Sequence, residues 1–249
     1  MFCGVSAAVL HGLPLYRTSP ARVHIAAMRG TSRSVRDVLR HETDLDDEDV
    51  VEVEGLRCTT LGRTVFDVAR TLTPEASVAC ADAALRSVAV SGNDQDERTA
   101  AQWRGSLAER AARSRARGVR QARRVIDFAD GRAQLPGESV SRVQLTRLGF
   151  GPPDLQVRVV APDGAEYRVD FGLDDVDAFG EFDGAGKYLD PALRGGRSIE
   201  QVVLDEKRRE DVIRGVTGRR FVRWDDAHIS TADALRRRLA EFGLHPPRR

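Results

Sequence analysis

The sequence predicts a mixed α/β protein, and three observations lead to that prediction. Short runs that alternate apolar and polar residues, as strands do, stand between segments whose apolar residues recur every three or four positions, as in helices. Of the 249 residues, 41% are hydrophobic and 31% are charged, which is a globular composition and not a disordered one. The length allows one large domain or two smaller ones, each with a proper core.

The first part of the chain, residues 1–90, is expected to form an α+β unit. Residues 22–27 and 50–53 have the alternation of strands. Residues 59–70 have helical spacing, and Pro74 suits the first turn of the next helix. These patterns predict a packed unit and indicate no chemistry by themselves.

A strongly basic connector is expected over residues 91–131. Residues 102–124 hold eight arginines and one glutamate, a net charge of +7. Several arginines recur at a spacing of three or four and would share one face of a continuous helix, although Gly118 is expected to split the segment into two helices. These side chains are candidates to contact DNA phosphates, and the alternative is a solvated helical face. The candidates are Arg113, Arg117, Arg120 and Arg124.

The remaining chain, residues 132–249, is expected to be a separate domain. Its patterns predict the order helix, three strands, helix, strand, helix. This order predicts a mixed sheet with helices packed on it. The expected elements are a helix at 138–148, strands at 155–160, 166–171 and 178–183, a helix at 198–215, a strand at 220–224 and a helix at 231–242.

Acidic residues concentrate on two of these expected strands. Asp170 lies near the end of one strand, and Glu181 lies on the next, followed by Asp183. A hairpin makes the carboxylates of Asp170 and Glu181 cross-strand neighbours, and alternation places Glu181 and Asp183 on one face. Such carboxylates repel one another unless a cation neutralises them, and oxygen ligands are what Mg²⁺ prefers. The pattern indicates a metal site, and solvent-facing acids on an ordinary hairpin are the alternative.

Several segments of this domain resemble a known group of proteins. They are Pro136–Ser139, Val169–Phe171, Gly180–Gly184 with Lys187, and Glu206–Asp211. They resemble actinobacterial proteins whose C-terminal part is similar to very-short-patch-repair (Vsr) endonucleases, members of the PD-(D/E)xK nuclease superfamily. The resemblance spans about residues 131–242. It implies a restriction-endonuclease-like core that hydrolyses phosphodiester bonds of DNA with Mg²⁺ or Mn²⁺ as cofactor.

The resemblance also implies roles for individual residues. Asp170 and Glu181 would be metal ligands, and Glu138 would be an acid supplied by the preceding helix. Lys187 would hold or polarise the attacking water. The implied chemistry is attack on phosphorus by a metal-activated water.

The sequence departs from the superfamily pattern at one catalytic position. The superfamily usually has a lysine two residues after the glutamate, and here that position is Asp183. Asp183 could instead serve as an extra metal ligand. Lys187 is the nearest lysine, and Glu206 and Lys207 on the following expected helix are weaker candidates. Two interpretations therefore stand: an active endonuclease, or a catalytically inactive DNA-binding regulator that retains the fold.

The start of the chain carries a second resemblance. Val5–Pro14 and Arg63–Arg70 resemble the central part of AbiEi-type antitoxins, which in that family follows a winged-helix DNA-binding domain. Here the sequence begins at the resembling helix, so either its start is truncated or the protein lacks that module. The resemblance makes an antitoxin of an AbiE-like toxin–antitoxin system the alternative function. The expected partners are therefore DNA and either a cognate toxin or a repair protein.

Several classes of protein are not expected. No apolar run approaches the roughly 18 residues of a membrane span. The three cysteines form no CxxC pair, which argues against a zinc knuckle or a disulfide framework and favours a cytoplasmic protein. The near-neutral net charge of +1 averages a basic connector and an acidic cluster, so it does not argue against DNA binding. The sequence leaves the oligomeric state open.

Overall fold

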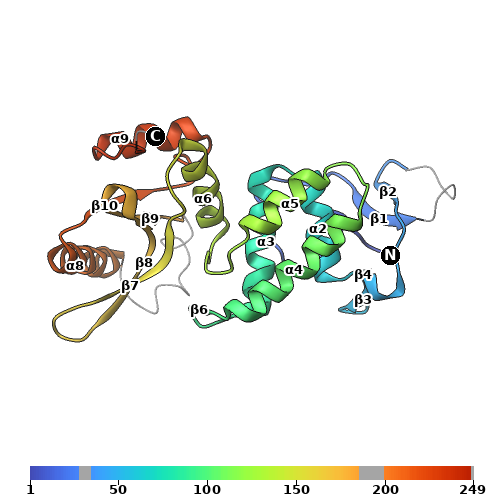
Figure 1. Ribbon diagram of the computed structural model, residues 1–249, viewed down its shortest axis with the longest axis horizontal. Helices are drawn as coiled ribbons and strands as arrows, with labels where there is room; N and C mark the ends of the chain where they lie inside the picture. Colours follow the sequence, from blue (N-terminus) through green and yellow to red (C-terminus); the bar gives the residue numbers. More distant parts are fainter. Residues whose placement is uncertain (28–34, 185–198, 248–249) are drawn as a thin grey trace. The chain divides into compact units, whose positions relative to one another are not determined.

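The computed structural model describes residues 1–27, 35–184 and 199–247 and has a mixed α/β fold (Figure 1). The chain divides into two compact units, Met1–Ser139 and Val140–Arg249. The basic connector expected over residues 91–131 lies within the first unit. None of the helices in the described part of the chain has the length and apolar character needed to cross a membrane.

The first unit combines short strand pairs with a group of helices. β1 and β2 pair in parallel, and β3 and β4 pair antiparallel through a tight turn. The strands expected at 22–27 and 50–53 and the helix expected at 59–70 are confirmed. The elements are α1 (Gly4–Leu10), β1 (Val23–Ala27), β2 (Val38–Glu42), β3 (Val50–Val53), β4 (Leu56–Thr59), α2 (Leu61–Thr71), α3 (Pro74–Ala89), β5 (Val90–Ser91), β6 (Asp94–Gln95), α4 (Glu97–Arg113) and α5 (Val119–Phe128).

Local chemistry explains where several of these helices begin. The Thr73 hydroxyl accepts a hydrogen bond from the Ala76 N–H, and Pro74 fills the first turn of α3. Gly118 separates α4 from α5, as expected, because its φ of 85° is left-handed and any Cβ there would overlap the Arg70 carbonyl. The arginine-rich segment therefore forms two helices and a link, and no single stripe.

The second unit is a four-stranded mixed sheet with helices packed on it. The strand order is β10-β9-β8-β7, with β7, β8 and β9 antiparallel and β10 parallel to β9. The expected element order is confirmed, with ends that differ by a few residues. The elements are α6 (Pro136–Leu148, which begins in the first unit), β7 (Asp154–Val160), β8 (Glu166–Leu173), β9 (Ala178–Phe182), α8 (Ile199–Thr217), β10 (Arg220–Trp224) and α9 (Ala232–Glu241).

One sheet face of the second unit is covered by α8. Phe179 on β9 pairs in register with Phe221 on β10, and Ile213 of α8 joins their core cluster. Glu181 and Arg223 lie two residues further along the same strands and are also paired in register. Because side chains alternate between faces, Glu181 and Arg223 point toward α8 as well.

Trp224 fills the space on the other side of the sheet. Its ring stacks on Phe171 at a centroid distance of 5.3 Å, and its Nε1 donates a 2.8 Å hydrogen bond to the Ser141 hydroxyl on α6. Gly180 lies beneath this ring, and a Cβ at that position would overlap the indole. The absence of a side chain at Gly180 therefore lets the tryptophan pack on β9.

We expect Gly180→Ala to destabilise the protein by about 1–3 kcal/mol, because the added methyl group overpacks the core against Trp224. Gly215→Ala is the matched control, since this exposed glycine of α8 has open space around it. The control should leave stability unchanged or raise it by up to about 1 kcal/mol through helix propensity. Urea unfolding followed by tryptophan fluorescence measures both changes, and equal midpoints for the two variants would contradict the packing argument.

Candidate functional site

Glu181 is a buried carboxylate held by two arginines. Its side chain on β9 is 8% exposed. Arg209 of α8 places its Nη2 2.5 Å from Glu181 Oε1, and Arg223 of β10 places its Nη2 3.3 Å from Oε2. Both carboxylate oxygens therefore contact a guanidinium group.

Two further acids from α8 complete this cluster. Glu206 Oε2 lies 2.8 Å from Arg223 Nη2 and 3.7 Å from Arg209 Nη1. Glu210 Oε2 lies 3.4 Å from Arg223 Nε. We call Glu181, Glu206, Arg209, Glu210 and Arg223 the α8–sheet network, because it joins the helix to β9 and β10.

Asp170 on β8 lies beside this network. Its Oδ2 accepts a 2.9 Å hydrogen bond from the Phe182 N–H, which fixes the carboxylate against β9. Burial raises the pKa of Glu181, and the nearby Asp170 charge adds to that rise, while Arg209 opposes it. The structure thus brings together the two carboxylates that the sequence predicts to be neighbours.

The arginines of the network remain charged despite their burial. Burial works against the charged form of Arg209, yet its pairing with Glu181 raises its pKa above the ordinary value. Burial likewise opposes the charge on Arg223, and the surrounding carboxylates of Glu181, Glu206 and Asp183 raise its pKa. Both guanidinium groups therefore act as permanent cations.

The other predicted site residues have different positions. The Asp183 N–H donates to the Trp224 carbonyl. Among the described residues no three or more histidine, cysteine or acidic side chains gather to hold a metal, so Asp183 does not complete such a group with the other acids. Glu138 is buried in the first turn of α6 and accepts the Gln134 N–H at 2.9 Å. Lys207 is exposed on α8, and Lys187 lies outside the described residues.

The acids of the network are balanced by arginines. Glu181, Glu206 and Glu210 carry a formal charge of −3, and Arg209, Arg223 and Arg214, which pairs with Glu210, carry +3. A Mg²⁺ or Mn²⁺ ion held by Asp170 and Glu181, as the resemblance implies, would have to displace a guanidinium group from Glu181.

The candidate DNA-contacting arginines occupy the end of α4, the link and α5. Arg113 is exposed at the end of α4, and its Nη2 lies 3.4 Å from Glu109. Arg117 lies in the link and is exposed, as are Arg120 and Arg124, one turn apart on α5. The segment therefore offers these four side chains to solvent from three different elements.

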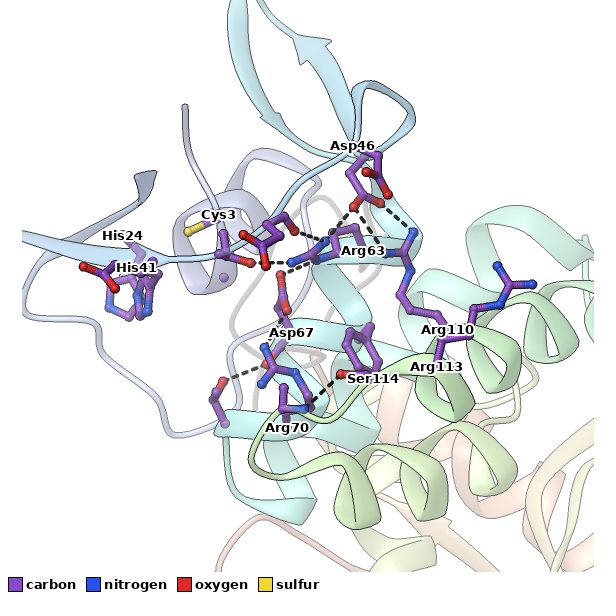
Figure 2. A pocket seen from close by; sticks show the side chains of 18 of the residues that line it. Cys3, His24, His41, Asp46, Arg63, Asp67, Arg70, Arg110, Arg113 and Ser114 are labelled. Carbon is purple, nitrogen blue, oxygen red and sulfur yellow. Dashed lines mark hydrogen bonds and ion pairs between the residues drawn. The ribbon is translucent and has the colours of Figure 1, made fainter. Parts of the chain in front are cut away.

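A second charged cluster, not predicted from the sequence, lies in a cavity of about 1270 Å³ within the first unit (Figure 2). Arg63 of α2 is its centre and is almost completely buried. Its guanidinium donates to Asp67 at 3.0 Å, to Asp49 at 2.6 Å and to the Thr43 hydroxyl at 2.6 Å. Arg63 therefore joins α2 to the segment between β2 and β3.

Two more arginines, Arg70 and Arg110, extend this cluster (Figure 2). Arg110 of α4 binds both oxygens of Asp49, at 2.5 and 3.2 Å, and Arg70 lies 2.8 Å from Asp67. Asp49 is only 1% exposed. We call Asp49, Arg63, Asp67, Arg70 and Arg110 the Arg63 cluster. It ties α2, α4 and the segment before β3 into one body.

The same cavity is lined by a histidine pair and a cysteine. His41 Nε2 lies 3.0 Å from His24 Nδ1, and burial is the main cause that lowers the pKa of both rings. Burial also raises the pKa of the Cys3 thiol to about 12, so the sulfur is a protonated thiol at neutral pH. The cavity therefore presents neutral imidazoles and an unreactive thiol beside its ion pairs.

Comparison with known proteins gives relatives whose function is uncharacterized. Two proteins of Mycobacterium tuberculosis, from strains CDC 1551 / Oshkosh and ATCC 25618 / H37Rv, are each 32% identical to the chain over 170 residues. The matched region is 64% of this chain and 59% of each relative, so the chain spans less than two thirds of the length of these relatives. No family model and no solved structure matches the chain.

We expect Asp49→Asn to cost about 3–5 kcal/mol of folding free energy, because it removes the charge that compensates buried Arg63 and half-buried Arg110. Asp47→Asn is the matched control, since Asp47 is exposed two residues away. The measurement is chemical denaturation followed by circular dichroism. A loss below about 1 kcal/mol for Asp49→Asn would show that the first unit does not depend on the Arg63 cluster.

Proposed function

We propose that the second unit is a metal-dependent endonuclease that hydrolyses phosphodiester bonds in DNA. One observation carries the proposal: the Asp170 carboxylate on β8 is held against β9 and lies near the buried Glu181 carboxylate, the two acids that the nuclease resemblance implies as metal ligands.

The frame around these carboxylates supports the same proposal. α6 precedes three antiparallel strands, α8 follows them, and β10 returns parallel to β9. This arrangement agrees with the mixed sheet expected from the nuclease resemblance. The α8 face brings Glu206, Arg209 and Glu210 onto the same side of the sheet as Glu181.

Individual residues of the second unit would have different roles at such a site. Asp170, oriented by the Phe182 N–H, and Glu181 would hold the cation. Arg223 would keep Glu181 in place from the neighbouring strand. The bound metal would supply a water of lowered pKa and neutralise charge on phosphorus. The roles of Glu138 as an accompanying acid and Lys187 as the group on the water stay predictions.

A catalytically inactive DNA-binding regulator or antitoxin is the second candidate. It is favoured by one observation, that both oxygens of Glu181 contact guanidinium groups. Asp183 at the position expected to be lysine agrees with it. A cytoplasmic location and a toxin or repair partner belong to the same set of proposals.

We expect the wild-type protein to nick supercoiled DNA with Mg²⁺ or Mn²⁺ and Asp170→Asn to reduce that rate by at least about 100-fold. Removing a residue that only hydrogen-bonds to a metal ligand lowers metal affinity or activity about 10–100-fold, and removing the ligand itself lowers it further. Asp163→Asn, in the exposed turn between β7 and β8, is the control and should be as active as wild type. Equal rates in wild type and Asp170→Asn, or no nicking of double- or single-stranded DNA by wild type, would favour the inactive regulator.

DNA binding itself is proposed to use the exposed arginines of the first unit. Arg113, Arg117, Arg120 and Arg124 are exposed over the end of α4, the link and α5. Guanidinium groups bind phosphate oxygens in a planar, two-bond arrangement. Such contacts position a protein on DNA without reading its sequence.

We expect the triple substitution Arg117→Gln, Arg120→Gln and Arg124→Gln to weaken DNA binding and to flatten its dependence on salt. The slope of log affinity against log salt concentration should fall by about 0.9 for each phosphate that the variant no longer neutralises. Arg236→Gln with Arg237→Gln on α9 is the control, because both arginines already pair with Asp233. Fluorescence anisotropy over a salt series measures the slopes, and an unchanged slope for the triple variant would mean that the basic segment is only a solvated face.

A further inference from the structure

We propose that Arg70 of α2 is a positioning residue for DNA binding, because it holds the link between α4 and α5 (residues 114–118) in one conformation. The inference rests on the proposed contact between DNA and the exposed arginines around this link. It adds to that proposal the residue that sets how those arginines are presented. Arg70 itself is not placed on the DNA, since its side chain is only 17% exposed and both of its terminal nitrogens are engaged within the first unit.

Arg70 binds the link and the Arg63 cluster at the same time. Its Nη1 donates to the Arg117 carbonyl at 3.0 Å, and its Nη2 donates to Asp67 Oδ1 at 2.8 Å. The guanidinium group also lies over the Phe66 ring, 5.1 Å from the ring centroid. Because the two nitrogens belong to one rigid plane, the position of Asp67 restricts where the Arg117 carbonyl can lie.

The position of Asp67 is fixed in turn by the buried centre of the cluster. Its second oxygen, Oδ2, accepts a 3.0 Å hydrogen bond from Arg63 Nε. Arg63 is almost completely buried and binds Asp49 at 2.6 Å. A continuous series of ion pairs therefore runs from buried Asp49 to an exposed peptide group of the link.

Two side chains of α5 hold the helix that follows the link. Gln121 Nε2 donates to the carbonyls of Ala69 and Leu72 at the end of α2, at 2.9 and 2.8 Å. Arg123 Nη2 donates to the Ala111 carbonyl near the end of α4 at 3.0 Å. The start of α5 is thus tied to both of the helices that the link approaches.

Gly118 lets the link come this close to Arg70. Its φ of 85° is left-handed, and a Cβ at this position would overlap the Arg70 carbonyl. Arg70 therefore meets the link twice, through its side chain at Arg117 and through its backbone at Gly118.

An ordered link matters because the candidate DNA-contacting arginines lie on the segments that it joins. Arg113, Arg117, Arg120 and Arg124 are exposed at the end of α4, in the link and on α5. If the link is loose, these arginines must be ordered when the DNA binds, and that cost lowers the affinity. The phosphates that they neutralise in the complex stay the same, so the salt dependence of binding does not change.

The first measurement is fluorescence anisotropy of the full chain with duplex DNA over a salt series. Arg70→Gln should bind about fivefold or more weakly than wild type, with an unchanged slope of log affinity against log salt concentration. Arg86→Gln is the matched control, because Arg86 of α3 also donates to two backbone carbonyls, those of Gly92 and Gly131, away from the link. This control removes the same charge from the first unit and should bind DNA as wild type does.

The second measurement is limited trypsin digestion, which tests the link in the absence of DNA. Trypsin cleaves after arginine, and the Arg117–Gly118 bond has to leave its contacts with Arg70 before it can enter the protease. Arg70→Gln should therefore be cut at this bond about fivefold or more faster than wild type, and Arg86→Gln at the wild-type rate. Gly118→Ala should also be cut faster, although it changes no charge, because its methyl group overlaps the Arg70 carbonyl. Mass spectrometry identifies the bond that is cut.

The outcomes separate this inference from the proposed function. If Arg70→Gln binds DNA as wild type does, while the triple arginine variant has a lower salt slope, the positioning role is overturned and the DNA contact stands. If the slope of Arg70→Gln falls by about 0.9, Arg70 contacts a phosphate itself and the positioning role is again overturned. If wild type binds no DNA, the proposed contact and the inference fail together.

Thermal unfolding of each variant checks that it is folded at the temperature of the measurements. Arg70→Lys replaces Arg70→Gln should the latter not fold, because it keeps the positive charge beside Asp67. One ammonium group does not span Asp67 and the Arg117 carbonyl as the guanidinium does, so Arg70→Lys should also be cut faster and bind DNA more weakly than wild type. Wild-type behaviour of Arg70→Lys in both measurements would overturn the role of the guanidinium in holding the link.

Discussion

Both units depend on burying carboxylates against arginine. An ionised carboxylate that leaves water costs several kcal/mol unless a cation and hydrogen bonds replace its hydration. Each of the three buried acids at the centres of these clusters receives two guanidinium groups. The pairs are Asp49 with Arg63 and Arg110, Asp67 with Arg63 and Arg70, and Glu181 with Arg209 and Arg223. The geometry of these ion pairs therefore decides how α2 and α4 join in the first unit and how α8 packs on the sheet in the second.

The need to pair buried carboxylates with cations gives a structural meaning to the preference for arginine over lysine in this sequence. Lys187 and Lys207 are the only lysines, so 37 of the 39 basic residues are arginine. A guanidinium group has five donors in a fixed plane and stays charged when buried, whereas a buried ammonium group loses its proton more readily. Arg63 uses this fork to bind two carboxylates, a hydroxyl and a backbone carbonyl at once. A lysine at that position could not satisfy all four.

The order of elements in the second unit was predictable because it depends on local patterns. Strand alternation and turns are properties of a few consecutive residues, and so is the helix break at Gly118 in the first unit. The proximity of Asp170 and Glu181 was predictable as well, since a hairpin joins their strands. The Arg63 cluster was not, because Arg63 and Asp49 are 14 residues apart and Arg110 and Asp49 are 61 apart. No pattern in the sequence states which of many arginines meets which acid, and the same holds for Arg209 and Glu181 across 28 residues.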